Sequence, residues 1–455
     1  MFQNNLTIEE RSIIIKRLIF LFVLLIFSLI LANKISYSLI VFFFFIFIFY
    51  VFLREYLWIF LIIAIPSLIF GKILNISITA NWIYEARIAE ILLLLTIIIF
   101  ILDFLFSKSI KKIRISGIGF LLFIYLILSF ISFKRIVDLR YFIFGLKVIV
   151  YSFLAYFLAL NLIDSKRKIK LFLYILSFTS FILSIQIFFK FYQMGFSSAF
   201  FFERSFILLP IAPLATTAAI LAFFTPLQLG FYFYLNNKTK VFIFISFFFS
   251  FLAVFLSLGK AAILSLLIAL FFMFVKLKKK RVAFILFIFM FLSGVYLIFY
   301  SFLVGLIERM TYIFVDQNTS FRIKEYISGW QIIQEHFFFG IGIGQQLIYF
   351  KKLLNIDTSN FVNNFFLQSF IDLGLIGFSL VLALIYFIYK EAKKSLSLFL
   401  KDDKNYFLVL GFISALIVAF LNGLAEVSFY ALPYAIIFFI TLGVFMNIKL
   451  LINKN

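Results

Sequence analysis

The sequence predicts an all-α fold: a polytopic transmembrane helical bundle of about 12 to 14 spans, with one large, partly helical loop outside the cytoplasm. Three observations predict it. Hydrophobic residues make up 65% of the chain and the mean hydropathy is +1.18, whereas a soluble domain is nearer half apolar. Apolar stretches long enough to cross a bilayer recur along the chain. Basic residues alternate between the loops that connect these stretches.

The apolar stretches give the expected spans in order. Two of them are also compatible with tilted or half-membrane elements, which leaves about twelve full spans. Pro210, Pro213 and Pro226 cluster in and before one span, and they indicate a kinked or broken helix there. The expected spans are residues 18–33, 37–53, 56–70, 91–106, 117–133, 141–163, 171–189, 209–234, 241–257, 261–275, 282–303, 366–389, 406–422 and 429–448.

The basic residues orient the chain. A net charge of +22 would suggest a nucleic-acid partner in a soluble protein. Here the basic residues lie in short loops between spans, where they set the topology instead. Alternate loops collect them, among others at 108–114, 166–170, 276–281 and 390–404. We therefore expect a multi-pass protein with both termini in the cytoplasm and no nucleic-acid partner.

The composition also excludes several kinds of site. The chain has no cysteine, so it can form neither a disulfide nor a thiolate metal site. A single histidine leaves no room for a histidine-based metal site. We expect no metal and no other cofactor.

One polar stretch, from about Gly305 to Gly377, interrupts the apolar pattern for far longer than a usual connection between helices. It divides the chain into an N-terminal transmembrane bundle (1–303), an extracytoplasmic loop (304–365) and C-terminal transmembrane helices (366–455). We therefore expect the functional residues of the protein in this loop.

Within that stretch, Arg322, Tyr326 and Trp330 follow one another at i, i+4 and i+8, so they line one side of a predicted helix. The glycines of the segment GIGIG, residues 340–344, end that helix in a tight turn. Further along, the pair Asn363-Asn364 is followed after nine residues by Gly374-Leu375-Ile376-Gly377.

This pattern resembles the periplasmic loop of the O-antigen ligase/polymerase superfamily. In that family an arginine, seven residues and a tryptophan precede a Gly-x-Gly turn, and the loop ends in His-Asn, nine residues and Gly-x-x-Gly. The chain has the same spacing, with Asn363 in the place of the family histidine.

The resemblance implies an O-antigen ligase-like glycosyltransferase of lipopolysaccharide biosynthesis in the bacterial inner membrane. Such an enzyme transfers a glycan from an undecaprenyl-diphosphate carrier to a hydroxyl acceptor, the lipid A–core, on the outer face of the membrane. It needs neither metal nor ATP, because the lipid diphosphate is the leaving group. A polysaccharide repeat-unit polymerase is the alternative. A glycolipid flippase or other transporter is the third possibility.

The resemblance also suggests which residues carry the reaction. Arg322 and Arg204 are the candidate catalytic residues, because a diphosphate is best held by the bidentate fork of arginine. Lys260, in SLGKAA, stands where the family often has arginine, although an interfacial lysine that snorkels explains it equally well. Together with Asn363, Tyr326 and Trp330, Lys260 is a candidate substrate-binding residue.

The resemblance implies that the family histidine is the general base for the acceptor hydroxyl, and this chain has Asn363 in its place. An amide cannot take a proton at neutral pH, so Asn363 is a candidate for binding only. Asp372, Glu426 and His336 are the candidates for the base. Asp372 lies in an apolar span, where an acidic residue suggests a function. His336 is also consistent with an ordinary interfacial histidine.

Overall fold

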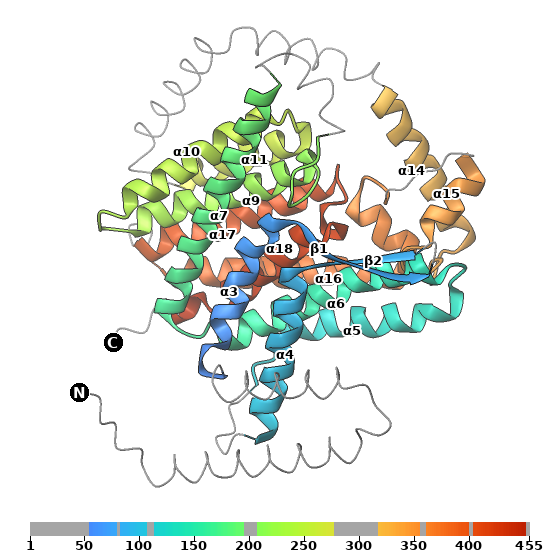
Figure 1. Cartoon of the computed structure of the whole chain (residues 1–455), viewed down its shortest axis with the longest axis horizontal. Helices are drawn as coiled ribbons and strands as arrows, with labels where there is room; N and C mark the ends of the chain where they lie inside the picture. Colours follow the sequence, from blue (N-terminus) through green and yellow to red (C-terminus); the bar gives the residue numbers. More distant parts are fainter. Residues whose placement is uncertain are drawn as a thin grey trace.

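The computed structural model describes residues 54–79, 82–106, 113–194, 207–276, 317–354, 361–399 and 404–451. Helices dominate these ranges, and the predicted all-α polytopic class is confirmed (Figure 1). The α-helices are α3 (Leu57–Ser67), α4 (Ile88–Phe106), α5 (Gly117–Ile131), α6 (Leu139–Leu162), α7 (Lys166–Gln193), α9 (Leu214–Tyr234), α10 (Lys240–Leu256), α11 (Lys260–Lys276), α14 (Gln317–Glu335), α15 (Gln346–Leu354), α16 (Phe365–Ser397), α17 (Lys404–Gly423) and α18 (Leu432–Met446).

Among the described residues, 7 helices are long and apolar enough to cross a membrane, and α10 and α18 are shorter apolar helices. The chain is therefore a multi-pass membrane protein. The expected spans 18–33, 37–53 and 282–303 lie outside the described residues. Each of the other expected spans coincides with a helix.

The ends of the helices differ more from expectation. Helix α7 begins at Lys166 and α16 continues to Ser397, so both run past the apolar segment that marked the span. A helix does not end where the apolar sequence ends, because its backbone bonds continue through charged residues. Helix α9 begins at Leu214 rather than at residue 209, because Pro213 is its N-cap and the residues before it form a turn closed by a bridge between Leu208 and Pro213.

A β-hairpin between α3 and α4 was not expected. Strands β1 (Lys72–Thr79) and β2 (Trp82–Arg87) pair antiparallel, with Lys72 opposite Arg87. The base of the hairpin packs on the turn before α9. There Arg87 Nη1 donates to the carbonyl of Ile211 at 2.7 Å, and a Cβ on Gly71 would lie 2.7 Å from the carbonyl oxygen of Pro210.

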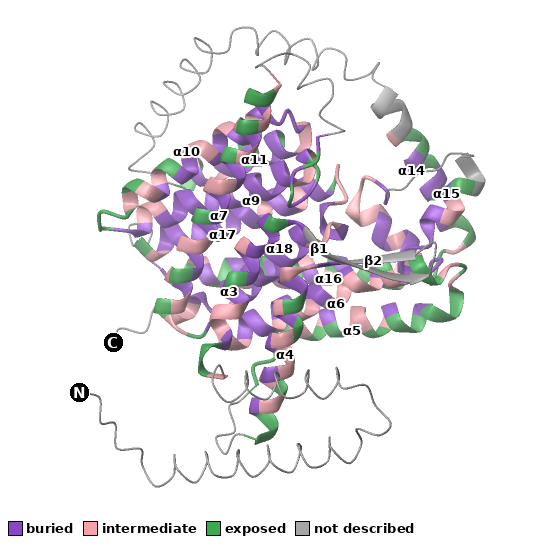
Figure 2. Cartoon of the chain, in the orientation of Figure 1, coloured by how far each residue is buried: buried purple, intermediate pink, exposed green. Residues whose placement is uncertain are grey.

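The most deeply buried helices are α9, α17 and α18, which appear largely purple in Figure 2, whereas α5 shows much green. Small residues allow these helices to approach closely. A Cβ on Gly411 of α17 would lie 2.8 Å from the Pro226 carbonyl of α9, and one on Gly443 of α18 would lie 2.7 Å from Ala159 Cβ of α6. Such small-residue contacts are a usual basis of helix association in membranes.

Helix α16 is interrupted at Gly374, whose φ is +64°. In an unbroken helix the carbonyl of Ile371 would accept from the amide of Leu375. Here Ile371 O accepts from Ile341 N at 3.0 Å, and Leu375 N donates to Phe337 O at 2.8 Å. The glycine-rich turn after α14 thus supplies the hydrogen bonds that the break in α16 removes.

This turn fixes α14 and α15 against the start of α16. Gly340, Gly342 and Gly344 all have positive φ, which explains the repeated glycines. The buried side chains between the three helices form a small core of Ile332, Ile333, Ile341, Phe350, Val362 and Ile371. In Figure 1, α14 and α15 lie together at the right-hand end of the bundle, which we call the α14 end.

Candidate functional site

Arg322 projects from the first half of α14 toward the turn that follows α17. Its Nη1 donates to the carbonyl of Ala425 at 2.8 Å, and its Nη2 donates to Glu426 Oε1 at 2.7 Å. The two side chains are 33% and 22% exposed, so the ion pair reaches the surface without being fully solvated. Both ends of the guanidinium fork are therefore engaged, and the cation is held in one orientation.

Asn363 lies beside the same helix face. Its Nδ2 donates to Glu325 Oε2 at 2.9 Å, and its carbonyl accepts from the hydroxyl of Tyr326 at 2.8 Å. Arg322, Glu325 and Tyr326 are spaced i, i+3 and i+4, so one face of α14 holds all three groups. Asn363 comes just before α16, and α14 packs against the start of that helix, where Gly329 lies against Leu367 and Ile371.

Asn364 joins the remaining elements. Its Oδ1 accepts from the amides of Phe366 and Leu367, each at 3.0 Å, and so caps α16. Its Nδ2 donates to the carbonyl of Leu424 at 3.0 Å, just after α17. The start of α16, the end of α17 and α14 thus meet at one corner. We call Arg322, Glu325, Tyr326, Asn363 and Glu426 the corner cluster.

Glu325 is the fully buried acid of the corner cluster. Burial raises the pKa of its carboxyl, and the hydrogen bond from Asn363 and the charge of Arg322 oppose that rise. The charge of Glu426 adds to the rise. The result is a carboxyl group whose pKa lies above that of an ordinary glutamate.

Asp372 lies elsewhere on α16, about 12 Å along the helix axis from the Asn364 cap. It is fully buried, and both carboxylate oxygens have partners. Oδ1 accepts from Gln368 Nε2 at 2.9 Å and from Gly344 N at 3.3 Å, and Oδ2 accepts from the Tyr430 hydroxyl. In this arrangement Asp372 ties the glycine turn and Tyr430 to α16.

The far end of α14 holds the other two aromatic candidates. His336 is about 21 Å from Arg322 along the helix, and its ring meets Tyr349 edge-on at 5.8 Å. Trp330 is 54% exposed. With Tyr326 it borders an open groove of about 610 Å³ between α14 and α16, also lined by Ile327, Ile333, Asn364, Phe366, Leu367, Phe370 and Phe378.

Lys260 is the first residue of α11 and is half-buried. The preceding Gly259 lies against Ala218 in the first half of α9. Helix α17 runs antiparallel to α9, because Gly411 packs on Gly230. Lys260 therefore lies toward the same end of the bundle as the last turn of α17. Arg204, the other predicted catalytic residue, lies outside the described residues.

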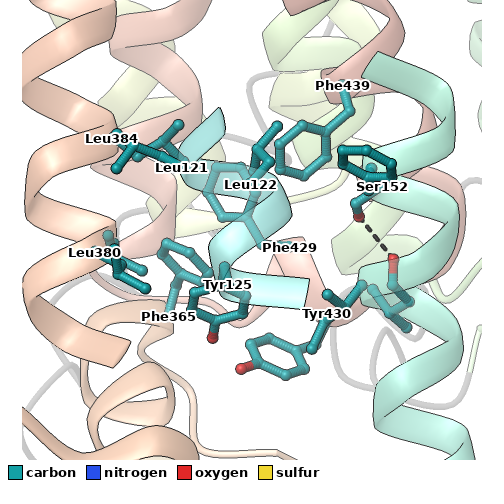
Figure 3. A pocket seen from close by; sticks show the side chains of 14 residues that line it. Leu121, Leu122, Tyr125, Ser152, Phe365, Leu380, Leu384, Phe429, Tyr430 and Phe439 are labelled. Carbon is teal, nitrogen blue, oxygen red and sulfur yellow. Dashed lines mark hydrogen bonds between the residues drawn. The ribbon is translucent and has the colours of Figure 1, made fainter. Parts of the chain in front are cut away.

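An apolar pocket lies beside the corner cluster, between α5, α6, α16 and α18 (Figure 3). Phe365 borders it, and the hydroxyls of Tyr125 and Tyr430 point toward one another at its edge in Figure 3. Its volume is about 60 Å³, less than half of the about 150 Å³ in which a protein binds benzene. The pocket is too small for a lipid chain.

The structure thus brings together four of the predicted site residues, namely Arg322, Tyr326, Asn363 and Glu426. The sequence reasoning missed Glu325. Its signal was the spacing of three residues from Arg322, on the face where the arginine was already expected. Glu325 directly follows Lys324, so in the sequence these two residues look like ordinary charged residues of a surface.

Residues 245–382 match the family model described as O-antigen ligase. The matched stretch includes α11, α14, α15, the glycine turn and the start of α16. Arg322, Glu325, Tyr326 and Asn363 fall within it, and Glu426 follows it. No curated protein shows significant similarity to the chain.

Proposed function

Because residues 245–382 match the O-antigen ligase family model, we propose that this chain is a glycosyltransferase of that superfamily that uses an undecaprenyl-diphosphate-linked glycan. The glycan would pass to a hydroxyl of a lipid A–core acceptor on the outer face of the bacterial inner membrane. The α14 end of the bundle would then be extracytoplasmic, with both termini in the cytoplasm.

The observation that supports this proposal most is the way in which the guanidinium group of Arg322 is held. Its guanidinium is held by Ala425 and Glu426 at the entrance of a corner that three helices form. A diphosphate leaving group gains negative charge as its bond to the sugar breaks, and a fixed cation stabilises that charge without reorganisation. Arg322 would act as this cation, and Arg204 and Lys260 remain proposed partners.

Tyr326 and Trp330 would bind the glycan. Both border the open groove between α14 and α16, and aromatic rings present flat apolar faces with polar edges. Asn363 would orient a sugar hydroxyl by hydrogen bonding.

The test uses purified protein in lipid nanodiscs with a labelled lipid-linked donor and a glycolipid acceptor. Arg322→Ala should lower turnover about 10²- to 10³-fold, the usual loss on removing one donor to a developing anion. Arg322→Lys should recover little, because an ammonium cannot reproduce the fork that contacts Ala425 and Glu426 together. Lys324→Ala is the matched control, since Lys324 is an exposed cation on the same helix.

Three results would contradict the proposal or redirect it. Equal turnover of Arg322→Ala and Lys324→Ala would exclude Arg322 from the site. Products that lengthen by donor units without any acceptor would identify the repeat-unit polymerase, which the asparagine at position 363 favours. Movement of intact donor across the bilayer with no new glycosidic bond would identify a flippase.

A further inference from the structure

Three carboxylates lie in or near the candidate site, and they differ in how their oxygens are used. Asp372 accepts from three donors through its two oxygens. Glu426 is paired with Arg322. Glu325 accepts from Asn363 through Oε2 only, and its buried Oε1 has no hydrogen-bond partner among the described residues.

An unpartnered oxygen of this kind is costly. Leaving a buried acceptor without a hydrogen bond destabilises the protein, and more so when the group is charged. Glu325 has no exposed surface, so Oε1 is out of contact with bulk water. A glutamine in its place would keep the contact with Asn363 without carrying a buried charge. The carboxylate is thus not needed merely to hold Asn363.

We propose that Glu325 is the general base of the transfer reaction, taking the role that the superfamily histidine would have at position 363. This inference rests on the proposed function. The acceptor oxygen forms a bond to the anomeric carbon while the bond from that carbon to the diphosphate oxygen breaks. The diphosphate leaves with the electron pair, and the hydroxyl proton of the acceptor passes to Glu325 Oε1.

The route to Glu325 runs through Asn363. Glu325 itself is buried, whereas Asn363 and Arg322 in front of it are partly exposed. The Asn363 amide donates to Glu325 in the resting site. The proposal requires the acceptor hydroxyl to enter beside Asn363, where it would donate to Oε1 as the Asn363 amide donates to Oε2. The donor diphosphate, held by Arg322, would lie on the same face of α14.

The charges around Glu325 suit this role. The titratable and charged groups that act on it are Arg322 and Tyr326 on its own helix and Glu426 beyond α17. Burial is the largest influence and raises the pKa of Glu325. A raised pKa makes the carboxylate a stronger base, and a pKa nearer neutrality is the more efficient one for a general base.

Glu325→Gln is the decisive variant, because a glutamine carbonyl still accepts from Asn363 but cannot take a proton. We expect turnover in nanodiscs to fall about 10²- to 10⁴-fold, with unchanged affinity for the lipid-linked donor. The control is Glu335→Gln, the same change at an exposed site of α14. In Glu325→Ala, added formate should restore part of the turnover.

The pH profile gives a second measurement. In the wild type, kcat/KM should fall as the pH drops through the raised pKa of Glu325, because the base is then protonated. Glu325→Gln should lose this acid limb, whereas Glu335→Gln should keep it. Wild-type transfer with equal rates for the two glutamine variants would overturn the assignment of Glu325 alone. Absence of wild-type transfer would overturn the proposed function and this assignment together.

Discussion

Asn363 shows how a single side chain changes the chemistry expected of its neighbours. A histidine at this position would meet the buried carboxylate of Glu325, because the present amide already lies 2.9 Å from it. The histidine would then be the base, and the carboxylate of Glu325 would orient its imidazole ring. With asparagine in place, the acid is the only group of the pair that can accept a proton.

This leads to a prediction for a double variant. Asn363→His introduced into Glu325→Gln should restore at least about tenfold of the lost turnover, because the imidazole supplies a base at the same corner. The acid limb of its pH profile should move toward about 6.5, the pKa of an unperturbed histidine. Asn363→Ala in the same background is the control and should restore nothing. A double variant as inactive as Glu325→Gln would show that this corner does not place a base on the acceptor.

At the residue scale, the sequence predicted several site residues but not the residues that contact them. The spacing of Arg322, Trp330 and the glycines located the loop helix, and Asn363 was found by its distance from Gly374. Contacts such as that of Glu325 with Asn363 cross 38 residues of sequence. Such contacts depend on how α14 docks, and the helix pattern carries no information about docking.

At the scale of elements, the break in α16 is the feature that holds the site in place. Gly374 has a positive φ, and an added Cβ would collide with the backbone of Phe338 and Phe339. Backbone cannot move aside as a flexible side chain does. The glycine is therefore required both by conformation and by close approach.

Gly374→Ala should therefore destabilise the protein by more than the about 1–2 kcal/mol that the left-handed conformation alone costs a residue with a Cβ. The midpoint of thermal unfolding in detergent should fall. Transfer activity should fall with it, because α14 is no longer held against the start of α16. Ser379→Ala, at an exposed position of α16, is the control. Equal midpoints for both variants would show that the turn adapts without cost.

The spans and the hairpin show what local sequence can and cannot predict about elements. Spans such as α5 and α17 were expected because about 20 apolar residues in a row have few alternatives to a membrane helix. The hairpin of β1 and β2 was missed because it depends on pairing between strands and on docking at Ile211. The break in α16 was missed because its compensating hydrogen bonds come from another part of the chain.

At the scale of the whole molecule, the alternation of basic residues predicts which end faces the cytoplasm. The chain contains no cysteine. A single introduced cysteine is therefore the only thiol that a maleimide can label, which makes the prediction testable. Gln334→Cys on α14 and Asn236→Cys in the turn before α10 both lie at exposed positions. In intact spheroplasts, an impermeant maleimide should label the first variant and should label the second only after permeabilisation.

Labelling of both thiols without permeabilisation, or of neither, would contradict this topology. A thiol at Glu335 serves as a second probe of the same side as Gln334. The orientation stays a prediction, and it rests on charge alone. The packing order of the helices was not predictable, because it depends on which small residues meet.

The exchanged hydrogen bonds at the break in α16 decide which parts of the protein can move. If the glycine turn swung away, Ile371 O and Leu375 N would each lose a hydrogen-bond partner, and an unsatisfied buried backbone group costs about 1–3 kcal/mol. The segment from Phe337 to Gly344 is thus tied to α16 by hydrogen bonds that an opening movement would have to break. If the corner cluster opens to admit a substrate, we therefore expect another element to move, while α14, which carries Arg322 and Glu325, stays attached to α16.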